Sequence, residues 1–261
     1  MTPHNGTGAG VVSPNTHAYA SRVLSMRRTL RREGLRGVIR RIGQRVRLSR
    51  DGLFYMRVLT KPLDGFQPLL PLHVKRFTGA TVEFRAIYRT FADDTAFADR
   101  FSGRVFCDVA FVDDDPAAFL WTSLGDCEVP SFNATLRLAL KAAYTMETYT
   151  KPEYRQKGIS VFLRNSVCQE LSALGYNRLF GLADIGNRPM MRLAEKTGFV
   201  PYCFISIRRL APFERLIATP CRPEYEGGLR IERIGWGLLP FRRPRWALTV
   251  MEPEDVGSLP G

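Results

Sequence analysis

The sequence predicts an α/β protein in which helices flank a central sheet, preceded by a basic helical extension. Residues 142–196 read as strand, glycine loop, helix, strand and helix, an alternation typical of α/β folds. A hairpin is expected over 105–122, because β-branched and aromatic residues flank the turn at 113–116. Between residues 22 and 50, apolar side chains recur at helical spacing among arginines.

The net charge of +13 is concentrated near the N-terminus. Residues 22–50 contain eleven arginines, no lysine and one acid, Glu33, so this stretch carries +10 and leaves +3 for the rest of the chain. A hydrophobic content of 45% in 261 residues can supply a sizeable core. The composition therefore indicates a nearly neutral folded body with a strongly basic arm.

Changes in composition divide the chain into five segments. Residues 1–20 are rich in small and polar side chains and are expected to be a mobile tail. Residues 21–58 are expected to be a basic amphipathic helical arm, and residues 59–71, with their prolines and glycine, a linker. The main domain is expected over 72–210, followed by a C-terminal extension, 211–261, with one strand and a mobile end.

Hydrophobic periodicity and punctuation by Gly and Pro locate the regular elements. The expected helices cover 82–100 (one or two helices), 161–174 and 189–196, and the expected strands cover 105–112, 117–122, 142–150, 178–183, 199–209 and 229–234.

The loop Arg155-Gln156-Lys157-Gly158-Ile159-Ser160 follows one expected strand and opens a helix. Backbone N–H groups at such a junction point in one direction, and the helix dipole reinforces their attraction for a pyrophosphate. Arg155 and Lys157 add positive charge, and Gly158 allows close approach of the backbone. The alternative is an ordinary strand-to-helix turn.

Three segments together are similar to a known family. Residues 150–160 (TKPEYRQKGIS), Gly186-Asn187 and residues 195–199 (EKTGF) closely resemble the acyl-CoA loop and the Asn-to-Gly-Phe segment of the GNAT superfamily. The resemblance is firm over 142–208 and weaker over 72–121. It implies a mixed, mostly antiparallel sheet flanked by helices, and an N-acyltransferase that uses acetyl-CoA or another acyl-CoA as co-substrate.

The resemblance also implies roles for individual positions. Backbone amides of the loop would bind the pyrophosphate, the end of the preceding strand would pair with the pantetheine amides and polarise the thioester carbonyl, and Asn187 would contact the pantetheine arm or order the strands. Asn187 could also cap the helix that begins near Pro189. The residues expected to bind the coenzyme are Thr148, Thr150, Arg155, Gln156, Lys157, Gly158, Ile159, Ser160 and Asn187.

The catalytic groups are less well defined by the sequence. Glu147 is the only carboxylate within 142–150, and Tyr144 on the same strand could act through water, so these two are the candidate general bases. The family often has a Tyr seven residues after the Asn to protonate the leaving thiolate, and that position here is Ala194. Either another group or solvent protonates the thiolate, or the protein binds acyl-CoA without efficient turnover.

The sequence offers no metal site. The five cysteines are widely spaced and read as reduced, buried thiols, with Cys168 packed inside a helix. Asp113, Asp114 and Asp115 read as turn residues, and His73 reads as structural.

The expected activity is transfer of an acyl group, with acetyl as the first choice, to a primary amine on a small molecule or protein by direct attack in a ternary complex. The alternative is a non-catalytic acyl-CoA-binding or scaffolding module. The arm at residues 22–50 is expected to lie on an anionic membrane or to pack on the domain, and it lacks aromatic side chains for stacking on nucleic acid. We expect a cytoplasmic protein, with association at the inner membrane as a further option.

Overall fold

The computed structural model describes residues 49–59, 66–91, 100–101, 104–210, 213–225, 228–235 and 245–251. Residues 49–261 belong to one compact unit. The predicted mobile tail, residues 1–20, and residues 21–48 of the predicted basic arm lie outside the described residues.

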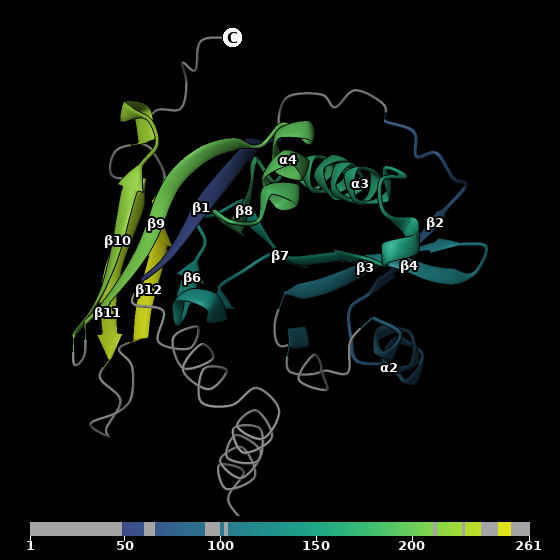
Figure 1. The fold of residues 1–261 in the computed structure, drawn as a ribbon, viewed down its shortest axis with the longest axis horizontal. Coiled ribbons are helices and arrows are strands. Elements are labelled where there is room, and N and C mark those ends of the chain that lie inside the picture. The colour runs from purple at the N-terminus through teal and green to yellow at the C-terminus, as the bar shows by residue number, and fades with distance from the viewer. Residues whose placement is uncertain are drawn as a thin grey trace, which may run out of the picture. The chain divides into compact units, whose positions relative to one another are not determined.

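The described residues form two sheets (Figure 1). In the larger one, eight strands lie in the order β10-β9-β1-β8-β7-β4-β3-β2, and every neighbouring pair is antiparallel except β7 and β8. Its strands are β1 (Ser49–Val58), β2 (His73–Phe77), β3 (Val105–Val112), β4 (Asp115–Ser123), β7 (Ala142–Thr150), β8 (Arg178–Asp184), β9 (Val200–Leu210) and β10 (Phe213–Pro220).

The smaller sheet has four strands in the order β11-β12-β6-β5. Its middle pair, β12 and β6, is parallel and joins segments more than one hundred residues apart in the sequence. Its strands are β5 (Cys127–Val129), β6 (Ala134–Arg137), β11 (Leu229–Gly235) and β12 (Arg245–Val250).

Among the described residues, α3 (Ile159–Ala173) and α4 (Arg188–Lys196) cover one face of the larger sheet and α2 (Val82–Arg89) covers the other (Figure 1). The buried side chains of α3 and α4 pack in one cluster with Leu120 and Leu179 of the sheet. Aromatic side chains dominate the cluster under α2, where Phe84 and Trp121 lie edge to face at 5.6 Å. The predicted mixed, mostly antiparallel sheet flanked by helices is therefore confirmed.

The structure corrects the predicted arm at its C-terminal end. Residues 49–58 are strand β1, which lies between β8 and β9 inside the larger sheet. Phe54 and Tyr55 are buried on opposite faces, so this strand is apolar on both sides. A short run of this kind lacks the alternation by which a strand is recognised in the sequence.

The C-terminal segment is also more ordered than predicted. The sequence predicted one strand at 229–234, which is confirmed as β11, but β10 and β12 lie beyond the predicted domain end as well. Strand β10 extends the larger sheet by pairing with β9, whereas β12 completes the smaller sheet. The folded body therefore includes segments on both sides of the predicted domain 72–210.

Candidate functional site

Strands β7 and β8 separate partway along their length. They pair in parallel from Ala142 and Arg178 as far as Thr145 and Gly181, and no described pairing continues beyond that point. Residues 148–150 of β7 stay paired with β4 on the other side. Because the backbone groups of β7 that face β8 have no strand partner there, they are free to pair with an extended ligand.

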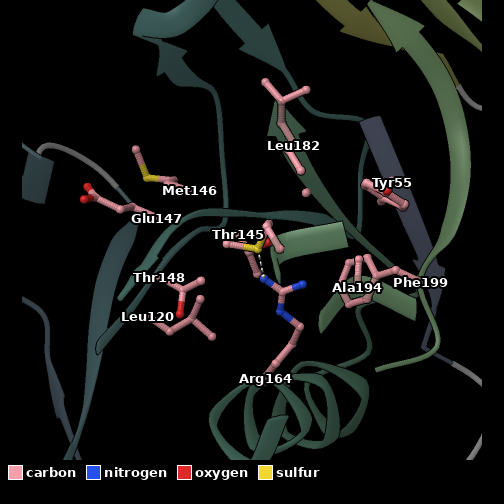
Figure 2. A pocket seen from close by; sticks show the side chains of 13 residues that line it. Tyr55, Leu120, Thr145, Met146, Glu147, Thr148, Arg164, Leu182, Ala194 and Phe199 are labelled. Carbon is pink, nitrogen blue, oxygen red and sulfur yellow. Dashed lines mark hydrogen bonds between the residues drawn. The ribbon is translucent and has the colours of Figure 1, made fainter. Parts of the chain in front are cut away.

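A cavity occupies the fork between the two strands (Figure 2). Strand residues line its walls, and α3 and α4 line it from one face of the sheet. At the point of separation, a Cβ on Gly181 would lie 2.9 Å from the Thr145 hydroxyl, so glycine allows the two strands to approach closely. The lining residues are Tyr55, Leu120, Thr145, Met146, Glu147, Thr148, Arg164, Gly181, Leu182, Ala183, Met190, Ala194 and Phe199.

The predicted phosphate loop lies at the junction of β7 and α3. Gly158 is the N-cap of α3 with φ 82°, and Gln156 also has a positive φ of 62°. Within the described part of the chain, the backbone N–H groups of residues 156–160 donate to no other residue. Successive free N–H groups at a helix start, with left-handed residues among them, form a concave anion-binding surface.

Side chains around this loop hold it in place. The hydroxyls of Thr150 and Ser160 are hydrogen-bonded at 2.7 Å and join the end of β7 to the first turn of α3. Arg155 donates through Nε to the Thr150 carbonyl at 3.1 Å. Lys157 lies with its ammonium 5.6 Å from the centre of the Tyr154 ring. Both cations therefore belong to the loop that carries the free N–H groups.

The turn between β3 and β4 anchors the segment that leads into the loop. Asp115 accepts hydrogen bonds from Lys151 Nζ and from the Tyr154 hydroxyl, both at 2.9 Å. The bond from Lys151 is the main reason that the pKa of Asp115 is lowered. Asp113 and Asp114 have positive φ values, which fits the predicted turn.

Asn187 is the N-cap of α4, as the helix-capping alternative predicted. Its side-chain oxygen accepts from the backbone N–H of Met190 at 3.2 Å. Because β7 and β8 are parallel, the loops that follow them open at the same edge of the sheet, so Asn187 and the loop at Gly158 lie at the same edge. The amide group of Asn187 is thus fixed beside the fork, with its oxygen used by the helix.

The two candidate bases have different environments. Tyr144 is buried in a hydrophobic cluster and stacks on Phe54, and burial raises the pKa of its phenol. The geometry argues against Tyr144 as a base that acts through water. Glu147 is exposed, lines the cavity and forms an ion pair with Arg100. A β-bulge in β7 between Thr145 and Thr148 interrupts the strand alternation next to it.

The sequence reasoning missed several cavity residues, and two of them carry a buried polar atom without a hydrogen-bond partner among the described residues. Arg164 of α3 and Tyr55 of β1 are buried, and both line the cavity. The only sequence signal for Arg164 is an arginine on the apolar face of the helix, between Leu163 and Val167. Nothing in the sequence indicates Tyr55, because β1 itself was not recognised.

Thr148 and Thr150 lie on β7 beyond the point of separation, as their predicted roles require. Thr148 lines the cavity, and its hydroxyl donates to the Phe119 carbonyl at 3.1 Å. Its hydroxyl is therefore already used within the sheet.

In the described part of the chain, no cluster of three or more His, Cys, Asp or Glu side chains could hold a metal ion. None of the described helices is long and apolar enough to cross a membrane.

Four of the five free cysteines are buried, as predicted, while Cys221 is exposed. Burial raises the pKa of the Cys168 thiol to about 11, so it is protonated and unreactive at neutral pH. His73 stacks on Phe111 at 5.0 Å, in a structural contact.

Comparison with known proteins identifies one family. The model of the acetyltransferase (GNAT) family matches residues 73–199. No curated protein sequence matches the chain significantly.

Several crystal structures are similar to the chain at low identity. A protein assigned to the GNAT family from Novosphingobium aromaticivorans DSM 12444 is 18% identical, with a TM-score of 0.43; the match covers 60% of this chain and 62% of that one, less than two thirds of its length. The ribosomal-protein-S18-alanine N-acetyltransferase from Escherichia coli is 17% identical, with a TM-score of 0.41, and the match covers 57% of this chain and 94% of that one. A Bacillus subtilis acetyltransferase in complex with CoA is 15% identical (53% and 79%; TM-score 0.38).

Identities and TM-scores this low carry no conclusion about the substrate of this chain. The family assignment rests on the match of the family model, which spans the fork, the loop at Gly158 and the Asn187 segment. Residues 73–199 match the GNAT family of acetyltransferases, as the loop and the Asn-to-Gly-Phe segment indicated.

Proposed function

We propose that the protein transfers an acyl group, acetyl as the first candidate, from acyl-CoA to a primary amine. The observation that carries this proposal is the row of free backbone N–H groups at residues 156–160, set at the start of α3 beside two cations. A diphosphate bound there would lie at the open edge of the fork between β7 and β8. The pantetheine arm would then run into the fork.

The residues present fit such a ligand. Backbone groups of β7 beyond Thr145 have no partner on the β8 side, so they can pair with the pantetheine amides. The cavity at the end of this path is lined mainly by apolar side chains and by buried polar atoms. It can exclude water from a thioester and strengthen electrostatic interactions with it.

Glu147 is the candidate that can accept a proton from the attacking amine. It lines the cavity and is exposed on its outer side, where Arg100 pairs with its carboxylate. In the proposed reaction, the amine nitrogen attacks the thioester carbon directly, and Glu147 accepts the amine proton itself or through a water. The reaction needs no covalent enzyme intermediate.

Calorimetric titration with acetyl-CoA tests the binding step. We expect acetyl-CoA, CoA and desulfo-CoA all to bind with Kd values in the micromolar range, because the diphosphate that they share is the main determinant of affinity. Failure of the protein to bind acetyl-CoA at millimolar concentration would remove the proposal. Thiol release in the presence of an amine panel, followed by mass spectrometry of the products, then identifies the acceptor.

A non-catalytic acyl-CoA-binding module is the second candidate, and Ala194 favours it. This residue is buried on α4 and lines the cavity where a longer side chain could supply a proton. Tight binding of acetyl-CoA without thiol release across the amine panel would support this candidate over the enzyme.

We also propose that the basic arm brings the protein to anionic membranes. The support is the sequence of residues 22–48, with ten arginines around an apolar face. Co-sedimentation of the full chain with phosphatidylglycerol vesicles, but not with phosphatidylcholine vesicles, is the expected result. Equal behaviour with both vesicles would exclude the proposal.

A further inference from the structure

An arginine is buried at the inner end of the fork. Arg164 is 4% exposed and projects from α3, where its neighbours on the buried face are Leu163 and Val167. Figure 2 shows its guanidinium directed toward the gap between β7 and β8, while the carboxylate of Glu147 points away from it. A cation therefore stands in the cavity opposite the candidate base.

The positive charge of Arg164 has no anionic partner among the described residues. No carboxylate forms an ion pair with it, and its Nε donates to no described group. Its nearest contacts are weak ones, the Met190 sulfur at 3.5 Å and the Phe199 ring at 5.1 Å. Burial lowers the pKa of Arg164 to about 10, so the guanidinium is still protonated at neutral pH.

The other buried arginine among the described residues, Arg57, donates a hydrogen bond to the Thr197 carbonyl. The half-buried Arg76 forms a two-pronged ion pair with Asp108. Burying an arginine without such partners is unfavourable, because the charge loses its hydration. An unpaired buried cation that lines a cavity is therefore suited to a negative charge that arrives with a ligand.

We propose that Arg164 stabilises the negative charge that develops on the coenzyme A sulfur when the thioester is cleaved. This inference rests on the proposed function, which sets the thioester in the fork. Ala194 contributes no donor to the same cavity, and the Tyr55 hydroxyl is the other buried polar group there without a partner among the described residues.

The proposed step is balanced in atoms and electrons. The amine nitrogen forms a bond to the thioester carbon, and the C–S bond breaks with its electron pair passing to sulfur. The proton lost by the amine passes to Glu147 or to water. The thiolate leaves beside the guanidinium of Arg164, which keeps its own protons, and solvent later protonates the sulfur.

Replacement of Arg164 by methionine separates this role from a structural one. Methionine fills a similar apolar space without a charge, so the loss of an unpaired buried cation should leave the melting temperature unchanged or higher. Arg57→Met is the matched control, since it removes a buried arginine that has a partner and leaves the Thr197 carbonyl without a donor. That variant should lower the melting temperature.

The decisive measurement is the pKa of the CoA thiol in its complex with the protein. The ultraviolet absorbance of the thiolate is followed against pH. The absorbance of the desulfo-CoA complex is subtracted, which removes the contribution of protein groups such as the Tyr55 phenol and the Cys168 thiol. We expect the bound thiol to ionise at least about one pH unit below free CoA in the wild type and Arg57→Met, and near free CoA in Arg164→Met. Arg164→Lys should retain part of the shift.

Turnover gives a second measure. Arg164→Met should lower kcat by roughly 100-fold with little change in CoA affinity, and a second change, Ala194→Tyr, should restore part of the lost kcat.

A thiol pKa in Arg164→Met equal to that in the wild type would overturn the inference while leaving the proposed function intact. So would a selective loss of dicarboxylic acyl-CoA substrates, because Arg164 would then bind the acyl group. Failure of the wild type to bind CoA would instead refute the proposed function.

Discussion

Replacement of Gly158 by alanine adds one carbon atom to the loop that we propose binds the diphosphate. Gly158 has φ 82°, a conformation that costs an L-residue about 1–2 kcal/mol. The added Cβ would also lie 2.6 Å and 2.7 Å from two carbons of the Phe66 ring. Since Phe66 is 41% exposed, its ring can move aside, and the backbone strain is the larger effect.

This strain should appear in coenzyme binding. A free loop can relax away from the left-handed geometry, whereas a bound diphosphate requires its N–H groups to converge. A penalty of about 1–2 kcal/mol then corresponds to a roughly 5- to 30-fold higher Kd for acetyl-CoA. Calorimetry of Gly158→Ala measures this change directly, and Phe66→Ala combined with it shows how much of the effect is steric.

Gly175→Ala is the matched control. Gly175 has φ 81°, follows the C-terminal end of α3, and has no atom within 4 Å of an added Cβ. The same backbone strain there should lower stability but leave the Kd for acetyl-CoA unchanged. If Gly158→Ala bound acetyl-CoA as tightly as the wild type, or if both variants lost affinity equally, the loop would not be the diphosphate site.

Three further predictions concern the base, the thiols and a buried carboxylate. Glu147→Gln should lower kcat about 100-fold and leave CoA affinity unchanged, and full activity in steady-state assays would exclude Glu147 as the base. Iodoacetamide at pH 8 should modify the exposed Cys221 before Cys168, whose thiol has a pKa of about 11; peptide mass spectrometry would reveal the opposite order. Burial raises the pKa of Asp108, although Arg76 acts in the opposite direction. The folded protein therefore binds this proton more tightly than the unfolded chain does. The resulting contribution to stability is fully present below the unfolded pKa of about 4 and is lost as pH rises through the folded pKa. Asp108→Asn should remove this slope from chemical denaturation curves measured across that pH range, and an unchanged slope would contradict the assignment.

The binding half of the candidate site was predictable from local sequence. The strand at 142–150, the loop at Gly158 and the helix after it form one contiguous stretch, so their order along the chain already fixes their geometry. The cap at Asn187 was likewise visible, because an Asn before Arg188 and Pro189 is typical of a helix start. Such features depend on neighbours within a few residues.

The remainder of the site depends on contacts between distant segments. Tyr144 was weighed as a base from its place on the strand, yet its burial depends on Phe54, which belongs to a strand inserted from far upstream. The bulge beside Glu147 arises from the pairing of β7 with β4, and one sequence alone does not fix that register.

The sequence by itself determined the family, the phosphate loop and the order of strands and helices around it, because each is encoded by spacing within a short segment. Only the tertiary structure decided that β1 lies between β8 and β9, and that Arg164 stands unpaired among the described residues in the fork. An apolar strand or a buried charge acquires its role from what packs against it, and those partners come from parts of the chain that local patterns do not connect.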